Sequence, residues 1–141
     1  MTKIELNRLN DAYHFDAANE DGNVVHLDAS GDIGGTGAGM RPMQILLAAM
    51  GGCSAIDIIS ILKKQRQDLK DFKISVSGER QKDVTPSLYE TVHVHYRFFG
   101  DLDAAKVEKA INLSLGKYCS VSKTLEKAGA KITYTFEIIS A

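Results

Sequence analysis

The sequence predicts a single α+β domain that spans residues 1–141. Strand-like alternation fills the first thirty residues, and a long apolar pattern of helical period follows a glycine-rich loop. Strand and helix patterns then alternate to the end of the chain, with no repeat, low-complexity tract or linker. A chain of 141 residues suits one globular domain, because domains most often hold about 100–150 residues.

The composition excludes several classes of protein. Hydrophobic residues make up 44% of the chain and charged residues 25%, as in ordinary folded proteins. The formal net charge of −1 gives no basic footprint for nucleic acid. The longest strongly apolar run, residues 45–50, is shorter than the about 20 residues of a membrane span, and residues 1–5 lack a signal-peptide core. We therefore expect a cytoplasmic protein without nucleic-acid or membrane partners.

The first thirty residues predict a three-stranded antiparallel meander. Apolar and polar side chains alternate in residues 3–7 and again in residues 13–16. Residues 20–23 contain Asp-Gly, a strong hairpin dipeptide, and residues 24–27 supply the return strand.

A flexible glycine-rich loop at residues 31–40 leads into the long helix. The loop has neither a GxGxxG motif between a strand and a helix nor a Gly-Lys-Ser/Thr sequence, so we expect no phosphate site. Pro42 fits the first helical position, and the pattern runs to about Gln67 with cations in its last turn. The helix is apolar on nearly all sides from Ile45 to Leu62. This predicts burial against a second subunit in an obligate homodimer.

Two adjacent glycines, Gly51 and Gly52, precede Cys53 inside this helix. Each costs a helix roughly 1 kcal/mol relative to alanine. The pair indicates either close packing of the backbone or space beside the thiol.

The rest of the chain predicts three strands and two helices. The strands are expected at residues 72–78, 88–99 and 132–138, and the helices at residues 103–118 and 120–127.

Histidine pairs are candidate metal ligands, but their surroundings argue against this use. His93 and His95 share one face of a predicted strand, and Arg97 on the same face indicates a solvated surface. His14 and His26 could lie on neighbouring strands, without an acidic motif around them. Because no CxxC occurs either, we expect no metal ion and no cofactor.

The two cysteines are either buried inert thiols or a redox pair brought together by the fold. Cys119 stands at the junction of two predicted helices, near Lys117 and Lys123, which predicts a lowered pKa for its thiol. Cys53 lies in an apolar helix with Asp57 one turn later, and an unassisted buried thiol is a poor nucleophile.

Two stretches carry a family resemblance. Residues 41–53 read RPMQILLAAMGGC and residues 117–122 read KYCSVS, which resembles the OsmC/Ohr superfamily of osmotically inducible and organic-hydroperoxide-resistance proteins. The resemblance covers the whole chain and includes the Gly-Glu-Arg strand at residues 78–80. It implies an OsmC-like fold in an intertwined homodimer, in which sheets from both chains flank paired central helices. It also implies a thiol peroxidase, in which Cys53 is oxidised by a small hydroperoxide, Cys119 resolves it as a disulfide, and a dithiol reductant resets the pair.

The chain also departs from the peroxidase pattern. Peroxidase members usually have an acidic residue ten positions before the first cysteine, where this chain has Met43 followed by Gln44. They also have an arginine near the N-terminal hairpin, where residues 17–23 contain none. The chain therefore resembles an OsmC-like branch without the acidic residue, and we expect Arg41 and Met43 to bind the substrate.

Three functions fit these observations. The first is a thiol-dependent hydroperoxidase with a Cys53/Cys119 redox pair in oxidative-stress defence. The second is a dimeric small-molecule-binding protein without peroxidase activity, and the third is a cytoplasmic dimer with inert thiols. The first predicts that the fold brings the two cysteines within disulfide reach, with Cα atoms about 4.4–6.8 Å apart when oxidised.

Overall fold

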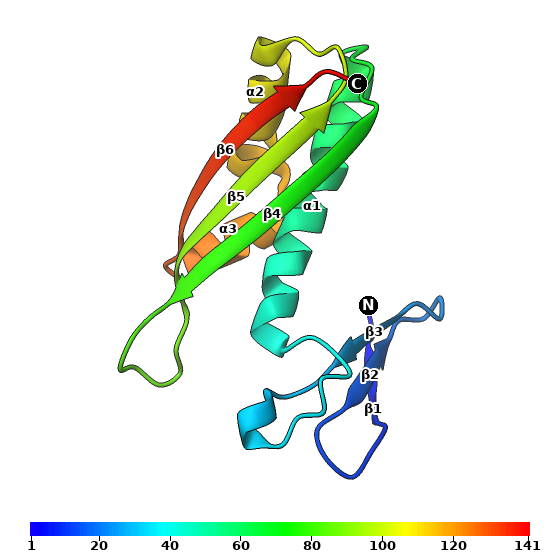
Figure 1. Cartoon of the computed structure of the whole chain (residues 1–141), viewed down its shortest axis with the longest axis vertical. Helices are drawn as coiled ribbons and strands as arrows, with labels where there is room; N and C mark the ends of the chain where they lie inside the picture. The colour runs from blue at the N-terminus through cyan, green and yellow to red at the C-terminus, as the bar shows by residue number, and fades with distance from the viewer. The chain divides into compact units, whose positions relative to one another are not determined.

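The computed structural model describes residues 1–141, which cluster into two compact units, residues 1–46 and residues 47–141 (Figure 1). Each unit has its own three-stranded sheet. The α+β class predicted from the sequence is confirmed.

The N-terminal unit contains the predicted antiparallel meander. Its strands pair in the order β1-β2-β3, and a short 3-10 turn follows them. The elements are β1 (Glu5–Arg8), β2 (Phe15–Ala18), β3 (Val24–Leu27) and η1 (Gly31–Ile33).

The glycine-rich loop is organised around the buried carboxylate of Asp28, a feature that the sequence prediction of a flexible loop missed. The carboxylate accepts hydrogen bonds from the hydroxyl of Thr36 at 2.8 Å and from the backbone N–H groups of Thr36 and Ala38 at 3.1 Å. Burial alone would raise the pKa of Asp28, but these bonds outweigh it and lower the pKa. Gly35 is required by close approach, because a Cβ there would lie 1.8 Å from the carbonyl oxygen of Ala29.

Helix α1 (Pro42–Lys64) begins at the predicted proline. The side chain of Gln44 reaches back and accepts the backbone N–H of Arg41 at 3.0 Å, which satisfies a donor at the helix start. The helix ends at Lys64 rather than near Gln67, because Arg66 takes a left-handed φ of 57°.

Within residues 47–64, α1 has two different faces. Its buried positions recur at helical spacing and lie at Met50, Gly51, Ser54, Ile58 and Leu62. Ile56 and Ile59 on another face are 69% and 47% exposed. By length and composition α1 could cross a membrane, and the core helix of a soluble protein passes the same test.

The C-terminal unit is a sheet with helices on one face (Figure 1). Its strands pair in the order β4-β5-β6, with β4 antiparallel and β6 parallel to β5. The strands are β4 (Asp71–Arg80), β5 (Tyr89–Phe99) and β6 (Lys131–Ile139). The crossover from β5 to β6 contains α2 (Ala104–Leu113), a π-helical turn η2 (Ser114–Tyr118) and α3 (Ser120–Lys127). The single helix predicted at residues 103–118 therefore ends in a π-helical turn.

The core of this unit lies between the sheet and the helices. One face of β5 is completely buried, through Val92, Val94, Tyr96 and Phe98. The rings of Phe72 and Phe98 stack with centroids 4.5 Å apart. Alternation along β5 therefore directs the odd-numbered side chains, including His93 and His95, to the other face.

Gly51 lets α1 approach β4 closely. A Cβ at Gly51 would lie 2.9 Å from Cγ2 of Val76, closer than side-chain carbons pack, whereas a Cβ at Gly52 would meet nothing within 4 Å. Close packing of the backbone, one of the two reasons expected for the glycine pair, is therefore confirmed at Gly51.

We predict that Gly51→Ala lowers the free energy of unfolding by about 1 kcal/mol, since overpacking costs about 1–3 kcal/mol and alanine returns about 1 kcal/mol of helix propensity. Urea denaturation of a double-mutant cycle with Val76→Ala measures the contact. The cost of Val76→Ala should be smaller in the Gly51→Ala background than in the original chain. Additive costs would show that the two positions do not touch.

Candidate active site

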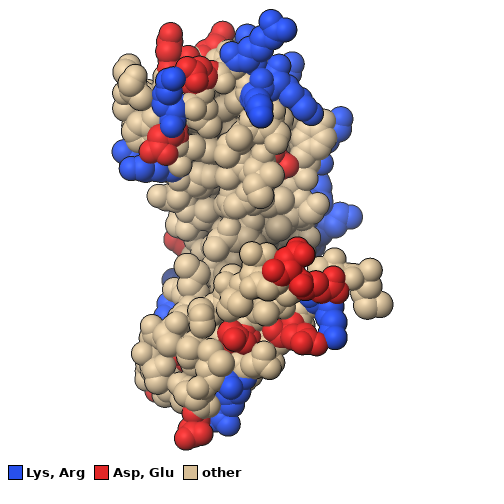
Figure 2. Space-filling view, turned by 90° about the vertical axis from the view of Figure 1, so that its right-hand side faces the viewer, with Lys and Arg blue, Asp and Glu red and all other residues tan.

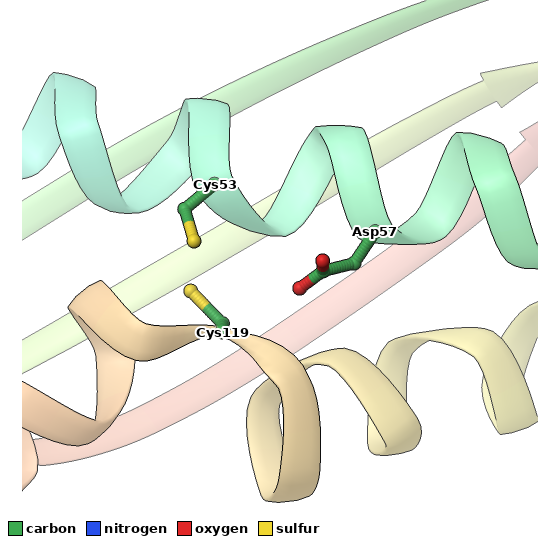
Figure 3. A group of neighbouring side chains, drawn as sticks. All are labelled: Cys53, Asp57 and Cys119. Atoms are coloured by element: carbon green, nitrogen blue, oxygen red, sulfur yellow. The ribbon is translucent and has the colours of Figure 1, made fainter.

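The fold brings three chemically active side chains of the C-terminal unit together. Cys53 and Asp57 lie one turn apart on α1, and Cys119 faces them from the segment between η2 and α3 (Figure 3). The two sulfur atoms and a carboxylate oxygen all lie within 4.8 Å of one another. Both cysteines are free thiols, Cys53 half-buried and Cys119 only 2% exposed. The expectation that the fold brings the two thiols together is confirmed.

The π-helical turn positions Cys119. The backbone N–H of Cys119 donates to the carbonyl of Ser114 at 2.7 Å, which closes the turn. The chain then leaves the helical conformation at Cys119, whose Sγ caps α3 by accepting the backbone N–H of Ser122 at 3.3 Å. Single π-helical turns inside helices occur frequently at functional sites. The predicted place of Cys119 at a helix start is therefore confirmed.

The electrostatic setting of Cys119 is the reverse of the one predicted. Burial raises the pKa of its thiol to about 11, the N–H of Ser122 opposes this, and Cys53 and Asp57 nearby raise the pKa further. The predicted lowering by the helix N-terminus and by flanking lysines is wrong, because desolvation outweighs the helix end. The two flanking lysines contact other groups: Lys123 Nζ lies 4.0 Å from the carboxylate of Glu126, and the ammonium of Lys117 lies over the ring of Tyr118.

A buried chain of hydroxyl groups joins the site to the sheet. The hydroxyls of Ser54 and Tyr96 lie 2.6 Å apart, and Ser114 Oγ lies 3.0 Å from Ser54 Oγ and 3.1 Å from Asp57 Oδ2. Burial raises the pKa of Tyr96 to about 12 in spite of its bond to Ser54. Sequence reasoning missed Ser54, Tyr96 and Ser114. The local signal was Ser54, a polar residue next to Cys53 in a largely apolar helix.

A groove of about 380 Å³ reaches the site on the side of Asp57. Its lining residues are Asp57, Ser60, Ile61, Lys64, Gln65, Leu113 and Tyr118. The groove gives a small molecule access to the carboxylate beside the two thiols.

The histidine pairs lie outside this site. His93 and His95 are on the open face of the sheet, where the ring nitrogens of His93 contact the hydroxyls of Thr133 and Thr135 at 2.7 and 3.0 Å. This agrees with the predicted solvated face. His14 Nε2 and His26 Nδ1 lie 2.9 Å apart in the N-terminal unit, with His26 on β3 and His14 directly before β2 rather than on it.

Arg41 and Met43, the predicted substrate-binding residues, lie in the N-terminal unit at the start of α1. Arg41 is exposed and Met43 half-buried. The pKa of Asp32 in the glycine-rich loop is lowered by its hydrogen bond from Ser30 and also by the charge of Arg41. A role for Arg41 and Met43 toward substrate stays a prediction.

Known proteins share this fold and this part of the sequence. A family model of OsmC-like proteins matches residues 35–135, which include both cysteines. Protein YhfA of Escherichia coli strain K12 is 45% identical over 101 residues, or 71% of this chain and 74% of that protein. The crystal structure of a hypothetical protein from Aquifex aeolicus VF5 is 31% identical, with a TM-score of 0.80 over 98% of this chain and 97% of its own.

A more distant structure shares the fold alone. The organic hydroperoxide resistance protein OhrB of Bacillus subtilis is 19% identical, with a TM-score of 0.68 over 97% of this chain and 98% of its own. The chain belongs to the OsmC-like family.

We predict that stability falls in alkali because the folded chain holds the Cys119 proton more tightly than the unfolded chain does. Burial raises this pKa from 9.0 to about 11, so the group does not affect the free energy of unfolding below pH 9 and lowers it as pH rises from 9 to 11. Urea denaturation under reducing conditions across this range measures the decline. Cys119→Ser keeps a capping side chain, and its free energy of unfolding should decline less steeply over this range. An equal decline of the free energy of unfolding with pH in Cys119→Ser and in the original chain would show that Cys119 does not cause it.

Proposed function

We propose that this protein is a thiol-dependent hydroperoxide reductase of oxidative-stress defence, in which Cys53 attacks the peroxide and Cys119 resolves the product. The observation that carries the proposal is a pair of free thiols whose sulfur atoms lie within 4.8 Å, one half-buried and one buried. OsmC-like family membership and the fold shared with OhrB, an organic hydroperoxide resistance protein, support it.

The proposed first step belongs to Cys53, the more accessible thiol. Its thiolate attacks one peroxide oxygen, the O–O bond breaks, and the leaving alkoxide takes up a proton to become an alcohol. Cys53 is now a sulfenic acid, and the peroxide has been reduced by two electrons. The groove lined by Asp57, one helical turn from Cys53, is the opening on this side of the site.

The proposed second step belongs to Cys119. Its sulfur attacks the sulfur of the Cys53 sulfenic acid, a disulfide forms, and hydroxide leaves and becomes water. The Cys119 thiol must lose a proton for this attack. Asp57 lies close to both sulfur atoms and is the carboxylate available to accept it. A dithiol reductant then restores both thiols, which suits a reducing cytoplasm.

We predict that one equivalent of cumene hydroperoxide removes two titratable thiols per chain. Cys119→Ser should lose its one remaining thiol and accumulate a sulfenic acid that dimedone traps, whereas Cys53→Ser should react at least about 100-fold more slowly, as when a nucleophile is removed. Thiol titration and intact-protein mass measure both. Ser120→Ala, next to Cys119 and exposed, is the matched control. Survival of both thiols in the original chain would overturn the proposal.

Arg41 and Met43 are proposed as substrate contacts in the same reaction. The guanidinium of Arg41 stays charged and favours a thiolate or an anionic ligand wherever it lines the substrate site. In the assay above, Arg41→Ala should slow Cys53 oxidation and Arg41→Lys should recover part of the rate. Lys3→Ala, which removes an exposed charge of the same unit, should leave the rate unchanged.

The proposal includes a homodimer built on the exposed face of α1. Ile56 and Ile59 are largely exposed there, and Figure 2 shows a broad surface of the C-terminal unit with few charged side chains. Contiguous apolar surface of this kind marks interaction sites when it forms a large patch. A second copy of the chain would cover them.

We predict that Ile56→Glu weakens self-association more than about 10-fold, because burying an unpaired charge costs several kcal/mol. Sedimentation velocity across protein concentrations measures the change. Val84→Glu, at an equally apolar exposed position of the β4–β5 connection, is the control and should leave the dimer intact. A monomeric original chain at micromolar concentration would contradict the dimer.

An apolar groove in the N-terminal unit favours a second function, the binding of a small apolar molecule. The groove measures about 280 Å³, and its lining residues are Leu6, Tyr13, Phe15, Leu27, Asp28, Ala29 and Pro42. Apolar lining with few polar groups is typical of ligand sites. Persistence of both thiols in the peroxide titration would make this binding function the better proposal.

A further inference from the structure

The site gathers three metal-binding groups without a neutralising cation. Cys53, Asp57 and Cys119 point toward one another (Figure 3), and their ligand atoms lie within 4.8 Å of one another. Asp57 forms none of the ion pairs of the chain. The two thiols and the carboxylate therefore face one space with no positively charged side chain paired to the carboxylate.

The chemistry of these groups fits Zn²⁺. Thiolate sulfur favours zinc over magnesium or calcium, and a carboxylate is a common third ligand. With Zn–S near 2.3 Å and Zn–O near 2.1 Å, ligand atoms of a tetrahedral site lie about 3.5–3.8 Å apart. The three groups therefore need to approach by at most about 1 Å, which is within the range of small side-chain rotations.

The surroundings already orient two of the three ligands. The N–H of Ser122 donates to Cys119 Sγ at 3.3 Å, a bond that favours a thiolate. Ser114 Oγ lies 3.1 Å from Asp57 Oδ2, which leaves the other carboxylate oxygen for a metal. Outer contacts of this kind accompany metal ligands and tune their affinity.

The site is open to solvent on the side of the carboxylate. The groove of about 380 Å³ is lined by Asp57, so a water molecule or a small ligand that approaches there would supply the fourth ligand of a tetrahedral site. Three protein ligands with one open position is the arrangement of reactive zinc sites, whereas structural zinc sites use four protein ligands.

We propose that the reduced protein binds one Zn²⁺ ion through Cys53 Sγ, Cys119 Sγ and a carboxylate oxygen of Asp57. The site does not depend on the proposed peroxidase activity, because binding requires only the three side chains. Metal binding and the disulfide state cannot occur at the same time, because a sulfur atom bonded in a disulfide no longer offers a thiolate to the metal.

Cobalt substitution of the full-length reduced protein tests the site without any peroxide. Titration with Co²⁺ should give a thiolate-to-cobalt charge-transfer band and the visible bands of tetrahedral cobalt, saturating at one ion per chain. Added Zn²⁺ should displace the cobalt. Because loss of an outer contact costs about 10–100-fold in metal affinity, Cys53→Ser, Cys119→Ser and Asp57→Asn should each lose more than about 100-fold. Ser114→Ala should lose about 10-fold.

Matched variants separate this site from other binding. Asp68→Asn removes an exposed carboxylate of the same unit and should bind like the original chain. Asp57→Asn retains both thiols, so its result stands even if Cys119→Ser folds poorly. The proposal is overturned if no charge-transfer band appears. It is also overturned if Asp57→Asn binds as tightly as the original chain. Loss of the cobalt spectrum in His26→Ala would place the metal at the His14–His26 pair instead and would overturn the proposal too.

Discussion

The hydrogen bond between Ser54 and Tyr96 fixes how α1 is rotated on the sheet, and the rest of the site depends on it. Its two oxygens lie 2.6 Å apart in a fully buried setting, where an unpaired hydroxyl would be costly. Once Ser54 faces β5, its neighbour Cys53 must face the crossover helices. Ser114 joins the same pair from the crossover and so places Cys119 opposite Cys53. The sheet, the helix and the crossover are aligned through three hydroxyl groups.

The same packing makes the two thiols unequal although they are close together. Cys53 is half-buried, whereas Cys119 is buried and has a strongly raised pKa. The two thiols are therefore close together but lie in different environments. Solvent exposure therefore makes Cys53 the sulfur that a reagent from solution meets first, while Cys119 is enclosed.

Local patterns predicted most of the fold and part of the site. Alternation predicted the meander and β5, and Pro42 predicted the start of α1, because these depend on neighbours in sequence. The end of α1 was set by the left-handed backbone of Arg66, which no composition signal marks. The raised pKa of Cys119 could not be predicted, since burial depends on tertiary packing. The pairing of Ser114 with Asp57, distant in sequence, was equally inaccessible.

The parallel pairing of β5 with β6 has a consequence for how the chain is made. A parallel pair needs a crossover connection, and here that connection contains Cys119. Contacts between segments distant in sequence form late, and synthesis proceeds from the N-terminus. As the chain leaves the ribosome, α1 is complete long before β6 exists to hold the crossover against it. During that interval β4 and β5 have already been made, but Cys53 has no partner thiol held opposite it.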